Sequence, residues 1–342
     1  MKAAILKAFG TPLSIEEVDD PHPGPDDTVL RVRVCGIDGT DLKLLDGFGY
    51  TPELPFIMGH EAAGVVETVG DRVTAFKPGD RVIPYNFLIP SESSWYQTER
   101  EQLSPDMQGI VGVKNRNGGY AERLLLPARQ LVRIPDGIAW HDAAVHGDAG
   151  LTAYHAIRRS RLTLGETALL IGVGGVGSFA IQFARLAGAR VIAAERTRTK
   201  LDWALHLGAT EVVESDHVAR AVRDLTDGRG VDCVVDIVGT EQTMAAAIDA
   251  VSPGGRIVIV GYTPDSLALS GKRLAQNELE VIGSRAGSRR ELSAALSLTA
   301  AGLVRSIVTD RAPLESVNEA LAKLRRSEVV GRLVLDIVTE TG

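Results

Sequence analysis

Gly172-Val-Gly-Gly-Val-Gly177 is the stretch that decides the fold of the second half of the chain. An apolar run at residues 168–172 leads into it and predicts a buried strand, and a helical pattern follows at 179–188. Glycines at this spacing, between a strand and a helix, are typical of a dinucleotide-binding turn. The stretch therefore predicts a nucleotide site. The plainer alternative is a tight turn that binds no ligand.

Each residue of this turn has an expected role. Gly172 makes the tight turn, Gly174 lets the backbone approach a pyrophosphate, and Gly177 lets the helix pack closely on the strand. Gly175 and Val176 lie in the same turn, which opens the predicted helix, and are also predicted to bind the cofactor. We expect backbone amide donors and the positive end of the helix dipole to meet the phosphates there.

The residue that ends the next predicted strand bears on the choice of cofactor. It is Glu195. A carboxylate in this place hydrogen-bonds the ribose hydroxyls of adenosine and repels a 2′-phosphate. This favours NAD over NADP. Arg196 and Arg198 follow directly, and an arginine beside the acid is also able to grip a 2′-phosphate, so NADP stays open.

The rest of the chain divides around this turn. Strands and helices alternate from residue 151 to 261, which predicts a doubly wound parallel sheet. The first 150 residues are rich in strands, with a long irregular excursion at 86–117. The boundaries we expect are a β-rich domain of residues 1–151 and 288–342, interrupted by a nucleotide-binding domain of residues 152–287.

Composition excludes several classes of function. A length of 342 residues suits two domains. The net charge of −7 argues against a nucleic-acid partner, which requires a basic surface. No apolar run approaches the roughly 18 residues of a membrane span. The two cysteines, Cys35 and Cys233, support no disulfide framework and fit a reducing cytoplasm.

A second informative stretch lies in the β-rich half. Residues 59–61 read Gly-His-Glu, immediately before a predicted strand. This places an imidazole and a carboxylate side by side on a tight turn. Together with the glycine turn, it predicts a metal in one domain and a nicotinamide cofactor in the other.

With these motifs the chain resembles the medium-chain dehydrogenase/reductase superfamily, in its zinc-type alcohol dehydrogenase branch. The likeness runs nearly end to end. It implies an α/β protein in which a Rossmann domain interrupts a GroES-like catalytic domain, and hydride transfer between NAD(H) and an alcohol or carbonyl. The strings that carry it are Cys35–Asp41, Gly59–Glu61, Gly79–Val82, Gly119–Glu122, Asp148–Tyr154 and the glycine turn.

The resemblance implies one catalytic zinc with three protein ligands. His60 matches the histidine ligand, and Asp148 stands where aspartate is an accepted third ligand. The first ligand, usually cysteine, falls on Asp38. Oxygen ligands are harder than thiolate, so other divalent ions are expected to compete with zinc. In the alternative interpretation, these three are ordinary polar residues beneath a loop.

The family's second, structural zinc is not expected in this chain. The four positions that carry cysteines in relatives fall on Pro90, Ser93, Tyr96 and Ser104. The excursion must then be held by packing instead.

The resemblance also assigns roles to four further residues. Thr40 matches the hydroxyl that carries a proton away from the alcohol, and Asp41 matches the acid that orients His60. Glu61 matches a carboxylate beneath the metal. Arg332 matches an arginine that approaches the cofactor phosphate.

The substrate is an alcohol or ketone whose exact kind stays open: a secondary alcohol, a polyol or a sugar. Asn86 occupies a position where many alcohol-specific relatives carry an aromatic ring, and a polar group there leans toward a hydroxylated substrate. The resemblance further implies a homodimer or homotetramer.

Two other functions are compatible with the motifs. One is a metal-free quinone or enone reductase of the same superfamily, although such relatives generally lose the histidine that this chain keeps. The other is a nucleotide-binding protein without chemistry, whose catalytic positions are expected to have drifted. Metal analysis separates the first from a dehydrogenase, and a turnover panel separates the second.

Overall fold

The computed structural model describes residues 1–338 and contains two compact units. Unit 1 comprises Met1–Asp148, Ser288–Gly302 and the chain from Ser306 onward, and unit 2 comprises Ala149–Gly287 with Leu303–Arg305. The predicted fold class is confirmed, because unit 1 is β-rich and unit 2 is built on a parallel sheet. No helix within residues 1–338 has the length and apolarity needed to cross a bilayer.

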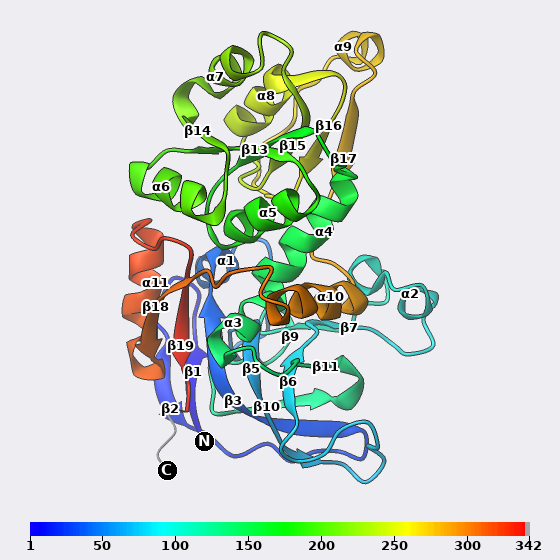
Figure 1. Cartoon of the computed structure of the whole chain (residues 1–342). Helices are drawn as coiled ribbons and strands as arrows, with labels where there is room; N and C mark the ends of the chain where they lie inside the picture. The colour runs from blue at the N-terminus through cyan, green and yellow to red at the C-terminus, as the bar shows by residue number, and fades with distance from the viewer. Residues whose placement is uncertain (339–342) are drawn as a thin grey trace. The chain divides into compact units, whose positions relative to one another are not determined.

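Unit 2 is a six-stranded, fully parallel sheet in the order β14-β13-β12-β15-β16-β17. Helices α5 and α6 lie on one side of it, and α7 and α8 lie on the other (Figure 1). The strands are β12 Thr167–Ile171, β13 Arg190–Glu195, β14 Glu211–Glu214, β15 Val231–Asp236, β16 Val251–Ile259 and β17 Glu280–Gly283. The helices are α4 Leu151–Ser160, α5 Gly175–Leu186, α6 Arg198–Leu207, α7 Val218–Leu225, α8 Glu241–Ala250 and α9 Gly271–Gln276, with a 3-10 turn at Ser215–His217.

The strand order places the glycine turn where such sheets bind ligands. All five residues of β12 are buried, as expected for a strand covered on both faces. β12 lies between β13 and β15. The chain places β13 and β14 on one side of β12 and then β15, β16 and β17 on the other, so the strand order switches there. Ligands bind at this switch point, outside the carboxyl ends of the strands. The residues that follow β12 directly are those of the glycine turn.

Unit 1 contains a seven-stranded sheet in the order β11-β6-β5-β3-β19-β18, with β10 also paired to β3. Two three-stranded sheets, β2-β1-β4 and β7-β8-β9, complete it. The strands are β1 Lys2–Leu6, β2 Ser14–Glu17, β3 Asp27–Ile37, β4 Phe56–Ile57, β5 Glu61–Val69, β6 Arg81–Pro84, β7 Phe87–Leu88, β8 Gly109–Val111, β9 Asn115–Arg116, β10 Arg123–Pro127, β11 Leu131–Arg133, β18 Val308–Pro313 and β19 Arg332–Asp336.

The helices of unit 1 are short except for two near the C-terminus. They are α1 Gly39–Leu45, α2 Ser94–Gln97, α3 Trp140–Ala144, α10 Arg289–Ala300 and α11 Val317–Arg325, with 3-10 turns at Glu101–Leu103, Ala128–Gln130 and Leu314–Ser316. A π-helical turn, η3 His146–Gly150, leads into α4. Residues 86–117, expected to be irregular, hold only the brief elements β7, α2, β8, β9 and one 3-10 turn.

Strand register in the seven-stranded sheet sets up the candidate site. β3 pairs antiparallel with β5, with Gly36 opposite Glu61. β3 also pairs antiparallel with β19, with Ile37 opposite Leu333. The end of β3 and the starts of β5 and β19 therefore meet at one edge of the sheet.

Candidate functional site

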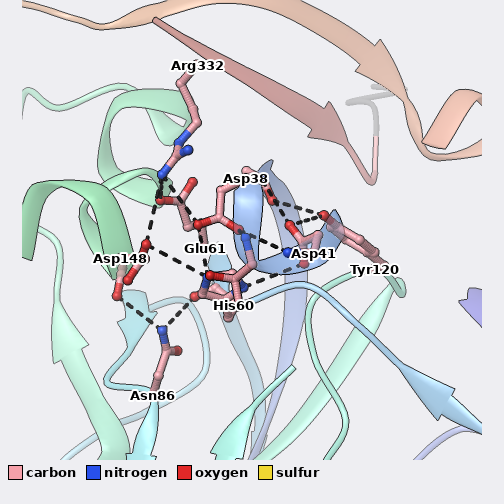
Figure 2. A network of polar contacts seen from close by, with 11 residues as sticks. Asp38, Asp41, His60, Glu61, Asn86, Tyr120, Asp148 and Arg332 are labelled. Carbon is pink, nitrogen blue, oxygen red and sulfur yellow. Dashed lines mark hydrogen bonds and ion pairs between the residues drawn. The ribbon is translucent and has the colours of Figure 1, made fainter. Parts of the chain in front are cut away.

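The structure brings together Asp38, His60 and Asp148, the three residues predicted as metal ligands (Figure 2). His60 Nε2 lies 3.5 Å from Asp38 Oδ2 and 3.9 Å from Asp148 Oδ2. One ligand atom of each residue lies within 4.8 Å of the other two. Across residues 1–338, no other group of three or more His, Cys, Asp or Glu side chains has this spacing.

Strand pairing explains the first two members of this cluster. Asp38 directly follows β3, and His60 directly precedes β5, so the antiparallel pair delivers both side chains to the same edge. Gly59 has φ +97°, and a Cβ there would lie 2.5 Å from the ring of Tyr120, so only glycine fits this turn. Asp148 arrives separately, in the π-helical turn η3.

Asp38 serves the backbone with one carboxylate oxygen and faces His60 with the other. It is the N-cap of α1, and its Oδ1 accepts hydrogen bonds from the backbone amides of Thr40 at 2.8 Å and Asp41 at 3.2 Å. The Oδ2 atom is the one that lies near His60. Aspartate is a favoured N-cap residue, so the departure from cysteine is compatible with the start of this helix.

Behind His60 lies a second carboxylate, which a buried tyrosine holds in place. Asp41 Oδ1 lies 3.6 Å from His60 Nδ1. Asp41 Oδ2 accepts hydrogen bonds from the Tyr120 hydroxyl at 2.8 Å and from the Asp38 amide at 2.9 Å. Asp41 and Tyr120 are both fully buried. Sequence reasoning missed Tyr120; its only signal was its place in the Gly119–Glu122 string.

Glu61 and Arg332 form a buried ion pair beside the cluster. Arg332 Nη2 donates to Glu61 Oε1 at 2.7 Å and lies 3.9 Å from Asp38 Oδ2 and 4.0 Å from Asp148 Oδ2. The sequence predicted a cofactor phosphate as the partner of Arg332. In unit 1 the guanidinium instead points at these three carboxyl groups, as Figure 2 shows.

Burial and charge act against each other in this cluster. Burial raises the pKa of Glu61 to about 8, against the opposing charge of Arg332. Burial alone would lower the pKa of His60, but Asp38 and Asp148 outweigh it and raise that pKa well above its ordinary value. Burial alone would raise the pKa of Asp38, but His60 and Arg332 hold it well below its ordinary range. The cluster also contains more carboxyl groups than cationic groups.

The residues present fit a divalent cation. A four-coordinate zinc with bonds of about 2.0–2.1 Å to nitrogen and oxygen holds its donor atoms about 3.3 Å apart. The distances of 3.5 and 3.9 Å from His60 Nε2 need only small adjustments. Buried carboxylates are normally paired or coordinate metals. Among the described side chains, His60 Nδ1 and Asp41 Oδ1 are buried without a hydrogen bond, so a small rotation of the ring allows them to pair.

Two other predicted site residues lie close by. Thr40, in the first turn of α1, is half-buried. Asn86, which the sequence predicted to contact substrate, is only 5% exposed. Its side-chain amide donates to the carbonyl oxygens of His60 at 2.8 Å and Gly147 at 3.1 Å. The structure thus commits this amide to the backbone of the ligand-bearing segments.

In unit 2, the glycine turn has the geometry of a nucleotide loop. Gly172 has φ +97°, and a Cβ at Gly177 would lie 2.0 Å from the carbonyl oxygen of Gly172. Gly174 precedes α5, and a Cβ there would meet nothing within 4 Å, so the backbone is open to an approaching group. Gly175 and Val176 are the first residues of α5. Their helix N-terminus is a suitable place for phosphate oxygens.

Glu195 closes this loop from the end of β13. Its Oε2 accepts from the backbone amide of Val173 at 3.0 Å, and its Oε1 accepts from that of Arg196 at 2.8 Å. Arg198 pairs with Asp202 one helical turn on, at 2.9 Å.

The four positions aligned with structural zinc ligands have other contacts. Ser93 caps α2, and its hydroxyl lies 3.2 Å from Asp106 Oδ2. The Ser104 hydroxyl accepts from the Asp106 amide at 3.1 Å. The guanidinium carbon of Arg289 lies over the Tyr96 ring, 4.7 Å from the centroid of the ring. Pro90 accepts a backbone hydrogen bond from the Ser93 amide at 3.2 Å.

Comparison with known proteins bears on both units. A family model described as "Alcohol dehydrogenase GroES-like domain" matches residues 24–136, and one described as "Zinc-binding dehydrogenase" matches residues 175–301. An alcohol dehydrogenase of Geobacillus stearothermophilus is 33% identical over 98% of this chain and 100% of its own length. The NAD-dependent alcohol dehydrogenase of Sulfolobus acidocaldarius is 32% identical with the same coverage. The crystal structure of the alcohol dehydrogenase from the archaeon Aeropyrum pernix superposes with a TM-score of 0.92 at 32% identity, covering 98% of this chain and 100% of that one.

The two units together define a pyridine-nucleotide oxidoreductase, in which a β-rich domain is combined with a doubly wound nucleotide domain. More narrowly, the chain belongs to the zinc-type alcohol dehydrogenases of the medium-chain dehydrogenase/reductase superfamily, as its sequence motifs predicted. It is an NAD(P)-dependent alcohol dehydrogenase.

Proposed function

We propose that this enzyme transfers hydride between NAD(H) and an alcohol or carbonyl substrate activated by one divalent cation. Asp38, His60 and Asp148 would hold the cation. The observation that carries this proposal is the meeting of one donor atom each from Asp38, His60 and Asp148 within 4.8 Å of one another. When bound, the cation supplies Lewis acidity, which lowers the pKa of an alcohol hydroxyl and polarises a carbonyl.

The surrounding residues have supporting roles in this proposal. Asp41 Oδ1, which lies 3.6 Å from His60 Nδ1, would accept a hydrogen bond from it after a small rotation of the ring and so keep Nε2 facing the cation. Thr40, half-buried two residues beyond Asp38, would relay the hydroxyl proton of the alcohol, accepting it as it releases its own hydroxyl proton toward solvent. The Glu61–Arg332 pair sets the charge beneath the cluster.

NAD is the proposed cofactor. Glu195 ends β13 beside the glycine turn, and its carboxylate is held there by two backbone amides. It is expected to accept from the adenosine ribose hydroxyls and to repel a 2′-phosphate. We expect kcat/KM to be higher with NAD than with NADP, and the Glu195→Gln variant to lose much of that preference. A strong preference of the wild type for NADP would contradict this assignment.

The substrate class is a secondary alcohol, a polyol or a sugar, and turnover over a panel of these with the matching ketones and aldoses identifies it. The proposed assembly is a homodimer or homotetramer, which light scattering of the purified protein tests directly.

Metal analysis is the decisive experiment. We expect about one equivalent of divalent ion per chain, loss of alcohol oxidation on chelation, and recovery on addition of Zn²⁺. One equivalent rather than two is expected because residues 86–117 lack the four cysteine ligands of a structural zinc. Protein without metal that reduces quinones or enones in the presence of chelator would favour the metal-free reductase. NAD binding without turnover of any substrate would favour a non-catalytic protein.

A further inference from the structure

Asn86 lies between the two segments that bring His60 and Asp148 to the cluster. Its Nδ2 donates to the carbonyl oxygen of His60 at 2.8 Å and to that of Gly147 at 3.1 Å. Gly147 directly precedes Asp148 in the π-helical turn η3. One amide group therefore bonds the backbone at one ligand and next to another (Figure 2).

We propose that Asn86 is a positioning residue of the cation site. By tying the His60 segment to the turn that carries Asp148, it sets the separation between two of the three donor groups. This inference rests on the proposed cation site and deepens it. The substrate contact that the sequence predicted for this residue stays a separate prediction.

The chemistry of the contact requires a primary amide. A side-chain NH₂ group offers two donors from one nitrogen, directed at two different acceptors. Aspartate at residue 86 would offer acceptors only, and serine would offer a single donor. The position is itself well anchored, because Asn86 lies between β6 and β7 and its carbonyl oxygen accepts from the Val111 amide at 3.0 Å.

The two segments approach each other closely at this point. A Cβ at Gly147 would lie 3.2 Å from the carbonyl oxygen of His60. Asn86 is only 5% exposed, so water does not easily replace its amide. Without a donor, both carbonyl groups would lose a buried hydrogen bond, and the segments would be expected to move apart.

The test measures metal affinity rather than turnover alone. Asn86→Leu removes both donors while keeping the branched shape and the number of side-chain heavy atoms, and Asn86→Ser keeps one donor and leaves room for water. Zn²⁺ affinity is measured by competition with a chelator, and the visible spectrum of the Co²⁺-substituted protein reports ligand geometry. Because partners of metal ligands typically contribute 10–100-fold to affinity, we expect a loss of that order in Asn86→Leu and a smaller loss in Asn86→Ser.

Asn318→Leu is the matched control. The Asn318 amide also makes two backbone hydrogen bonds, to the carbonyl and amide of Leu13 at 2.9 and 2.8 Å. This variant is expected to lose thermal stability while keeping the Zn²⁺ affinity and the Co²⁺ spectrum of the wild type. A purely structural role for Asn86 would give its variants the same behaviour as Asn318→Leu.

The outcomes separate this inference from the function it rests on. Wild type that binds neither Zn²⁺ nor Co²⁺ would contradict the proposed function itself. Wild type that binds them, alongside a folded Asn86→Leu or Asn86→Ser with unchanged affinity and spectrum, would overturn the positioning role alone.

Discussion

The cation cluster of Asp38, His60 and Asp148 differs instructively from the lobe, residues 86–117. The resemblance to zinc dehydrogenases relates both regions to metal sites. The cluster keeps ionisable donors that converge, with Asp38 and His60 buried and Asp148 half-buried, an arrangement that is costly without a cation. In the lobe, Ser93 and Ser104 instead contact Asp106. The difference teaches that family likeness does not by itself indicate an ion: converging ionisable donor atoms do.

The largest expected effect comes from removing the nitrogen donor of the cluster. His60→Ala is predicted to lower kcat/KM for alcohol oxidation by at least about a thousandfold, or about 4 kcal/mol in the barrier, because Lewis acidity is lost. Metal content should fall to well below one equivalent. Ser93→Ala is the control in the lobe, expected to cost roughly 1 kcal/mol through its helix cap and to leave metal content unchanged. Loss of metal from Ser93→Ala would contradict the distinction between a cluster that binds a cation and a lobe that binds none.

A smaller effect is expected from restoring the family's thiolate. Asp38→Cys should raise the preference for Zn²⁺ over Mn²⁺ by roughly tenfold or more, because thiolate is the softer ligand. The same change weakens the N-cap of α1 and is expected to lower the free energy of unfolding by about 1 kcal/mol. Competitive binding of the two ions and urea denaturation measure these effects separately.

Asp38→Asn separates the two roles of this residue. Asparagine caps a helix as well as aspartate does, so stability should be kept while affinity for both ions falls. Equal metal affinity in Asp38→Asn and wild type would remove Asp38 from the ligand set.

A third prediction concerns Tyr120, which donates to Asp41 behind His60. Tyr120→Phe removes the hydroxyl, whose hydrogen bond to Asp41 is worth about 1 kcal/mol, while Asp41 keeps the bond from the Asp38 amide. Zn²⁺ affinity is predicted to fall about fivefold, as measured by chelator competition. Tyr154→Phe, in unit 2, is the control and should leave affinity unchanged. A Tyr120→Phe protein with wild-type Zn²⁺ affinity would show that the Asp41 carboxylate needs no hydrogen bond from Tyr120.

The sequence predicts the parts of the site that lie on local motifs. The glycine turn follows β12 and opens α5 because glycine alone fits φ +97° at Gly172 and the close packing at Gly177. The turn before His60 depends on glycine in a similar way, because Gly59 adopts the positive φ of the tight turn that presents the imidazole. Such features depend on a few adjacent residues, so a single sequence is enough to find them.

The contacts that organise the site depend on long-range register, which a single sequence does not specify. Arg332 meets Glu61 across 271 residues, because β19 and β5 both pair with β3. The β3–β5 ladder also contains register shifts, so no count along the chain predicts which side chains meet. For the same reason the hydrogen bonds of Asn86 to the His60 and Gly147 carbonyls, and that of Arg332 to Glu61, do not follow from the sequence alone.

The smallest predicted effect lies in the lobe and concerns pH. Burial raises the pKa of Glu101, with Arg289 opposing it. The folded chain therefore holds this proton more tightly than the unfolded chain, and stability falls as the pH rises above the ordinary carboxyl pKa. Glu101→Gln removes that titration. It should be more stable than wild type by roughly 0.5 kcal/mol at pH 8, with a smaller difference at pH 4.

Urea denaturation of both proteins at the two pH values measures this difference, with Glu92→Gln as an exposed control from the same lobe. The lobe would then relieve its buried carboxyl by taking up a proton, whereas the cluster relieves its own by binding a cation. Glu101→Gln is therefore also expected to have the same metal content as wild type. A Glu101→Gln protein that loses metal, or whose gain in stability shrinks as the pH rises, would remove the contrast between the two regions.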